Sequence, residues 1–183
     1  MRDADIKNFS VFLSEFQSET DRGAALVGAA LIDQKLADTL RSFFVAGKVA
    51  GELLDSGTAP LGTFSARIKL AHALGLIDSF ELAECGLIRK VRNEFAHSIH
   101  GTTFSEPKVA TLCERLESDL PGGREAFKDN PRGMFINAVT LIVMRLTYRA
   151  EWVAKEKRVT KSWPKTDDSA PRQVPTDILP IYR

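Results

Sequence analysis

"DRGAALVGAALIDQKLADTLRSFF", residues 21–44, predicts a long helix at the centre of a helical bundle. Its first half is rich in Ala and Gly, and side chains this small allow a neighbouring helix to approach closely. In its second half, apolar residues recur at helical spacing among polar ones. Thr20 or Asp21 can cap it, and we expect it to run to about Ala46.

The segments on either side of this helix also show helical periodicity. Further helices are expected at about 4–18, 48–54, 64–74, 80–97, 106–119 and 133–158. Gly75 is placed to end the helix 64–74, and residues 121–133 are expected to form a loop with two turns. We find no alternation typical of strands. The predicted fold class is all-α: a single-domain bundle of about six helices.

The C-terminal segment differs in composition from the rest of the chain. Residues 160–183 contain four prolines and no helical period, so we predict a domain over 1–159 and an extended tail over 160–183. The end of this tail, "ILPIY" (178–182), is apolar and is expected to dock either on its own domain or on a neighbour.

Composition and charge exclude several classes of protein. The 183 residues are 44% hydrophobic and 27% charged, which is typical of a soluble globular domain. No apolar run reaches the roughly 18–20 residues that span a bilayer, and the N-terminus lacks a signal peptide's apolar core, so we expect a cytoplasmic protein. Cys85 and Cys113 are expected to be buried, reduced thiols.

The net charge of +1 is unevenly distributed along the chain. Residues 145–183 hold nine Lys/Arg and five Asp/Glu (+4), whereas residues 1–144 hold sixteen and nineteen (−3). A dedicated duplex-DNA binder usually has a basic domain or stripe. We therefore expect weak DNA binding without sequence preference. The sequence also lacks metal-ligand spacing and nucleotide-binding loops, so no metal or cofactor is expected.

"LIRKVRNEFAHS", residues 87–98, carries the first candidate site, at the end of an amphipathic helix. At 100° per residue, Asn93 and His97 lie about 40° apart, while Arg92 and His97 lie about 140° apart. Arg92 and His97 of one straight helix therefore cannot hold the same small group. They could do so if the helix ended near Ala96, or across a two-fold dimer.

Two interpretations of Arg92, Asn93 and His97 remain open. They can form a buried polar network that ties the helix to Asp33 and to the loop 57–67. Alternatively, the spacing resembles the HEPN superfamily, in which many small helical-bundle domains are dimeric, metal-independent ribonucleases. That resemblance implies RNA as substrate, with His97 as general acid/base, Arg92 bracing the phosphate and Asn93 orienting either group.

The segment "TAPLGTFSARIKLA" (58–71) offers a second candidate, a ligand or partner surface. Thr63 and Ser65 provide hydroxyls and amides at a helix N-terminus, with Arg67 and Lys69 nearby. The alternative is simply a capped helix start. Asp33 lies on an otherwise apolar helix face, so it needs a partner, and Arg67 or Arg92 is the candidate.

Three segments together resemble the bacterial mannitol operon repressor family: "DRGAALVGAALIDQKLADTL" (21–40), "LLDSGTAPLGTFSARIKLAHALGLI" (53–77) and "LIRKVRNEFAHS" (87–98). The resemblance implies an all-helical cytoplasmic regulator of transcription that lacks a recognisable helix-turn-helix. It also implies a protein partner, the phosphocarrier protein of the sugar phosphotransferase system. From the helices 21–46 and 87–97 we further expect a homodimer.

Overall fold

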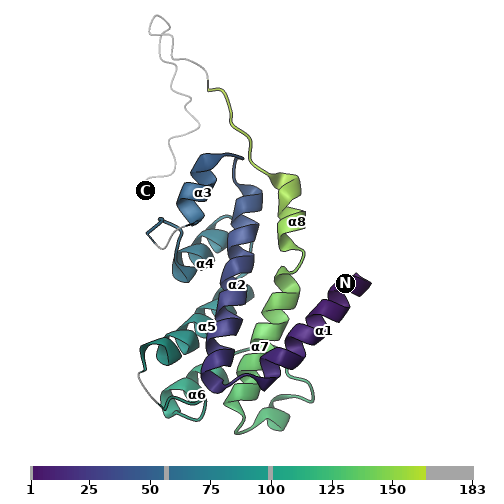
Figure 1. The fold of residues 1–183 in the computed structure, drawn as a ribbon, viewed down its shortest axis with the longest axis vertical. Helices are drawn as coiled ribbons and strands as arrows, with labels where there is room; N and C mark the ends of the chain where they lie inside the picture. Colours follow the sequence, from purple (N-terminus) through teal and green to yellow (C-terminus); the bar gives the residue numbers. More distant parts are fainter. Residues whose placement is uncertain (1, 56–57, 99–100, 164–183) are drawn as a thin grey trace, which may run out of the picture.

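The computed structural model describes residues 2–55, 58–98 and 101–163, and every regular element in them is helical. Figure 1 shows the arrangement. The elements are α1 (Asp3–Ser18), α2 (Asp21–Phe43), α3 (Lys48–Leu54), α4 (Phe64–Ala73), α5 (Ser79–His97), α6 (Pro107–Glu114), the 3-10 helix η1 (Arg124–Phe127), α7 (Pro131–Leu146), α8 (Arg149–Val153) and the 3-10 helix η2 (Ala154–Glu156). The prediction of an all-α, single-domain bundle is confirmed.

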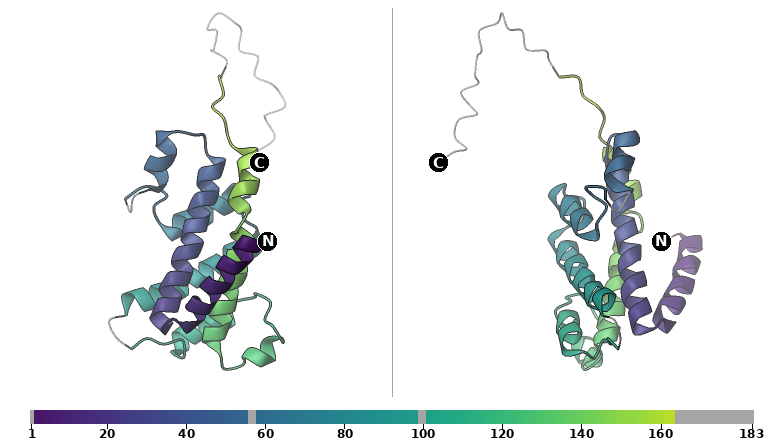
Figure 2. Two further views of the ribbon diagram at one scale, coloured as in Figure 1. Left: turned by 45° about the vertical axis from the view of Figure 1, so that its right-hand side comes forward. Right: turned by 60° about the vertical axis from the view of Figure 1, so that its left-hand side comes forward.

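Helix α2 is the centre of the bundle, as its small residues predict. It packs against α5, α7, α8 and α4, and more lightly against α1 and α3. Figure 2 shows α1 on one side of α2 and α7, with α4, α5 and α6 on the other. A Cβ atom on Gly28 would lie 2.9 Å from Phe16 Cζ and 3.1 Å from Val139 Cγ1, so glycine allows α1 and α7 to approach α2 at this point.

The core is continuous along the bundle. The helix expected to be amphipathic, α5, buries its apolar stripe, which consists of Leu87, Ile88, Val91 and Phe95. Phe95 packs against Phe104 with ring centroids 4.9 Å apart, and Phe104 packs against Phe135 at 5.2 Å. These ring contacts link α5 to α7 through the segment that precedes α6. Cys85 and Cys113 are free and buried, as expected.

The predicted helix ends are largely confirmed. Thr20 and Thr63 accept hydrogen bonds from the backbone N–H groups of Gly23 and Ala66. Gly75 follows α4 with φ 70°, a left-handed conformation that favours glycine.

Two predicted helices are shorter in the structure. The helix expected over 106–119 ends at Glu114, because Glu117 N–H and the Ser118 hydroxyl donate to the buried carboxylate of Glu84 instead of continuing the helix. The helix expected over 133–158 is divided at Thr147 into α7, α8 and η2. At this break Arg149 turns towards the buried carboxylate of Glu81, 2.7 Å away.

Two further differences concern the loop 121–133 and the tail. The loop contains η1, which the sequence did not indicate. Beyond η2, residues 157–163 are exposed and without regular structure, and Arg158 N–H bonds to Phe43 O at 2.8 Å. The remainder of the predicted tail, including "ILPIY", lies outside the described residues, so the domain boundary at 159/160 remains a prediction. No helix in the described ranges has the length and apolarity needed to cross a membrane.

Candidate functional site

Asp33, Arg67 and Arg92 come together where α2, α4 and α5 meet, and we call this cluster the Asp33 seam. Arg67 Nη1 lies 2.9 Å from Asp33 Oδ1, and the two side chains are 12% and 23% exposed. Burial raises the pKa of the Asp33 carboxyl, while the positive charges of Arg67 and Arg92 oppose that rise. The sequence-based expectation that Asp33 pairs with Arg67 or Arg92 is met by Arg67.

Arg67 also donates hydrogen bonds to two backbone carbonyl groups. Its Nε donates to Leu61 O and its Nη2 to Leu54 O, each at 2.9 Å. Arg67 therefore ties the end of α3 and the loop that follows it to α4. Its nitrogen atoms are all engaged within the chain, so the structure supports an internal bracing role for this arginine.

The other members of the predicted partner surface lie elsewhere on α4. Thr63 is exposed and caps the helix, with Oγ1 3.2 Å from Ala66 N. Ser65 is half-buried and Lys69 exposed, and on a helical wheel both lie about 160° from Arg67. The structure therefore brings Asp33 and Arg67 together and places Ser65 and Lys69 on another face, which we call the α4 face.

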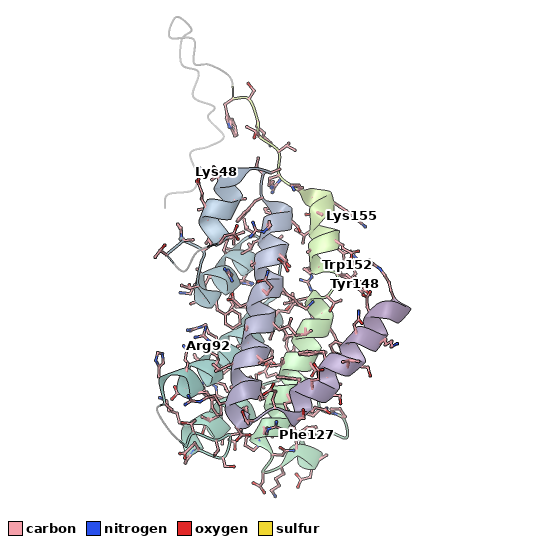
Figure 3. The ribbon with its side chains drawn as sticks, viewed as in Figure 1. Lys48, Arg92, Phe127, Tyr148, Trp152 and Lys155 are labelled. Carbon is pink, nitrogen blue, oxygen red and sulfur yellow. The ribbon has the colours of Figure 1, made fainter. Side chains whose placement is uncertain are left out.

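Arg92 and Asn93 form a half-buried polar pair on α5. Arg92 Nη1 donates to Asn93 Oδ1 at 3.1 Å. Figure 3 shows Arg92 on the flank of α5 towards α4. A guanidinium beside a carboxamide offers several N–H donors, which suits an oxygen anion such as a carboxylate or a phosphate.

His97 ends α5 and is exposed, with no hydrogen bond or ion pair to the residues that the structure describes. It therefore does not share the contacts of Arg92 and Asn93. Of the expected polar network, the structure shows the Arg92–Asn93 hydrogen bond, while the ion pair to Asp33 and the bond to Leu61 O in the loop come from Arg67.

Sequence reasoning missed a buried charged cluster, the Glu81 cluster. Glu81 is 0% exposed, and its carboxylate accepts from Arg145 Nε at 2.9 Å, from Arg149 Nη2 at 2.7 Å and from Asp78 N at 3.0 Å. Asp78 accepts in return from Glu81 N at 2.8 Å, which completes a capping box. The D-x-x-E spacing of residues 78–81 was the available signal.

Two of the open clefts on the described surface are larger than the others and lie outside these clusters. One, of about 510 Å³, lies between α5 and the α6–η1 segment and is lined by Lys90, Arg115, Arg124 and several carboxylates. The other, of about 370 Å³, lies between the end of α2 and α3 and is mostly apolar, with Phe44, Val49 and Leu53 among its lining residues. In the described part of the chain, no three His, Cys, Asp or Glu side chains are grouped to hold a metal ion.

The fold and these sites define an all-helical domain whose candidate binding features are surface clusters and open clefts. Comparison with known proteins gives the family. The model of the mannitol repressor (MtlR) family matches residues 11–146, so the chain belongs to this family.

The fold is similar to that of a solved relative. A chain in the X-ray structure of the MtlR–HPr complex from Escherichia coli matches with a TM-score of 0.52 and 20% sequence identity, covering 80% of this chain and 98% of that one. No curated protein sequence matches this chain.

Proposed function

We propose that this chain is a regulatory protein that acts by binding another protein, and that its partner is the phosphocarrier protein of the sugar phosphotransferase system. Membership of the mannitol repressor family, over residues 11–146, is the observation that carries the proposal. The similar fold of a chain from an MtlR–HPr complex supports it. On this proposal, the chain influences transcription of a carbohydrate operon from the cytoplasm through its protein contacts.

The α4 face is our proposed docking surface. Lys69 is exposed and forms no ion pair with the described residues, whereas Asp33 and Arg67 are engaged with each other at the seam. A free lysine beside the exposed Thr63 and the half-buried Ser65 offers both charge and hydrogen-bond donors to a partner.

Titration calorimetry of the full chain with the host's phosphocarrier protein tests the proposal, using the partner both with and without its phosphoryl group. We expect saturable binding to at least one form, and Lys69→Glu should weaken it about five-fold or more. Lys7→Glu, an exposed lysine on α1, is the matched control. Binding that Lys69→Glu leaves unchanged would move the site off α4, whereas no binding to either form would refute the proposed partner.

The proposed function does not require this chain to bind a specific DNA sequence itself. Because residues 1–144 carry a charge of −3, the isolated protein should shift duplex DNA only weakly and without sequence preference. A sequence-specific, salt-resistant mobility shift by the purified chain would contradict this expectation.

A second candidate is a metal-independent ribonuclease of HEPN type. One observation favours it: His97 is exposed at the end of α5 without a polar partner among the described residues, while Arg92 and Asn93 form a polar pair one turn earlier. Because Arg92 and His97 are about 140° apart on the helix, a homodimer would be required to bring both to one phosphate.

Cleavage of single-stranded RNA in EDTA distinguishes the two candidates. A ribonuclease would leave 2′,3′-cyclic phosphate ends, and His97→Ala and Arg92→Ala would each abolish the activity at an unchanged thermal midpoint. Light scattering tests the dimer, because a monomer of 20.2 kDa at micromolar concentration would exclude it. If the wild-type protein is a dimer and does not cleave RNA, the ribonuclease candidate is excluded and the regulatory function is the one that remains.

A further inference from the structure

Both tryptophans of the chain, Trp152 and Trp163, lie at its described C-terminal end and are exposed. Trp152 on α8 is 58% exposed and Trp163 is 78% exposed. A tryptophan usually buries most of its large ring, so two exposed rings within twelve residues indicate a surface that binds something flat or apolar. Figure 3 shows Trp152 and Lys155 on the side of α8 away from α2.

The residues between the two rings are basic. Segment 152–163 contains four Lys/Arg and one Asp/Glu, a net charge of +3, against −3 for residues 1–144. Lys155, Lys157 and Lys161 are exposed and form no ion pair with other described residues. Unpaired cations of this kind are available to an anionic ligand.

The segment is also held in place at one point. Arg158 N–H bonds to Phe43 O at 2.8 Å, and its guanidinium lies 4.9 Å from the centre of the Phe43 ring. This contact fixes the start of the exposed segment against the end of α2. Lys157, Lys161 and Trp163 therefore extend from an anchored base, with about 3.3 Å per residue available along the chain.

We propose that segment 152–163 binds single-stranded nucleic acid without sequence preference. Exposed aromatic rings with lysines between them match what such a strand offers, since bases stack on the rings while phosphates contact the lysines. A duplex hides its base faces, so it can use only the lysines. This site is independent of the α4 face and of the phosphocarrier partner.

Intrinsic fluorescence gives a direct test, because the only two tryptophans are the proposed contacts. An oligothymidylate of about 20 nucleotides, titrated into the full chain at low salt, should quench this fluorescence. Binding to the protein should also raise the fluorescence anisotropy of a dye-labelled form of the same oligonucleotide. Three exposed lysines predict a salt dependence of log K on log [salt] with a slope of about −2.

Variants assign the binding to this segment. Trp152→Ala and Trp163→Ala should each weaken binding about five-fold or more, whereas Val11→Ala, an exposed apolar residue on α1, should not. Lys157→Glu with Lys161→Glu should weaken it further, while Lys7→Glu with Lys90→Glu changes the net charge equally and should have little effect.

Several results would overturn the proposal. The first is an absence of fluorescence quenching at about 50 µM oligonucleotide. The second is tighter binding of a duplex of the same length. The third is an equal affinity for heparin together with binding that the tryptophan substitutions leave unchanged. Equal weakening by the control pair Lys7 and Lys90 would also overturn it, because the binding would then depend on total charge alone.

Discussion

Removing the carboxylate of Glu81 should cost more stability than removing any exposed carboxylate of this protein. Glu81 has 0% exposure and joins the N-terminus of α5 to Arg145 on α7 and Arg149 on α8. In Glu81→Ala, both guanidinium groups lose their shared acceptor. Arg149, whose side chain is 19% exposed, has limited access to water as a replacement.

The size of the effect follows from this burial. Breaking a buried ion pair by removing one partner costs about 3–5 kcal/mol. Arg145 is 38% exposed and keeps its bond to Asp78, so we expect the lower end, about 3 kcal/mol. For a chain of this length, each kcal/mol lowers the thermal midpoint by roughly 2–4 °C, which gives roughly 6–12 °C in total.

Glu151→Ala is the matched control, since it also removes a glutamate carboxylate, but from an exposed ion pair. Glu151 pairs with Arg2, and their side chains are 56% and 64% exposed. Such pairs contribute about 0–1 kcal/mol. Urea unfolding of both variants, followed by circular dichroism, gives the two free energies of unfolding directly.

A double-mutant cycle then isolates the interaction. If Glu81 acts through Arg149, Glu81→Ala should cost much less in an Arg149→Ala background than in the wild type. The reasoning would be refuted if Glu81→Ala and Glu151→Ala lowered stability equally, or if the cost of Glu81→Ala were the same in both backgrounds.

Three other predictions concern packing, proton linkage and thiol reactivity. Gly28→Val should destabilise the fold by about 1–3 kcal/mol through overpacking against Phe16, measured by urea unfolding, with Ala30→Val on the exposed face of α2 as control. Because the pKa of Asp33 is raised in the folded state, the wild type should lose stability relative to Asp33→Asn as the pH rises from 3 to 6; a difference that grows in the opposite direction contradicts this. Burial raises the pKa of Cys85 and Cys113 to about 12, so iodoacetamide at pH 8 should label neither thiol until urea unfolds the chain, and rapid labelling of native protein would disagree.

The candidate site shows how far sequence reasoning extends. Asp33 was identified from its position on an apolar helix face, and both candidate partners were named. The choice of Arg67 for the ion pair depended on how close α4 lies to α2, which no local pattern contains. By contrast, the separation of Ser65 and Lys69 from Arg67 needs no tertiary structure, because both lie about 160° from Arg67 around the same helix.

The buried carboxylates of Glu81 and Glu84 show the opposite case. Each carboxylate lies on a helix with an ordinary apolar pattern, and each accepts hydrogen bonds from residues at least 33 positions away in sequence, in addition to the local bond from Asp78 N to Glu81. The contacts of these two carboxylates also explain the helix ends at Glu114 and Leu146, where the periodicity predicted longer helices. Helical periodicity cannot reveal such distant donors.

By itself, the sequence determined the helical class, the central position of residues 21–43, the buried stripe of α5 and most helix caps, because periodicity, small residues and capping side chains act within a few turns of chain. The tertiary structure alone decided which charges meet, where α6 and α7 end, and that both tryptophans remain exposed. The physical reason is that burial and long-range pairing depend on which helices become neighbours, and this is settled only when the whole core packs.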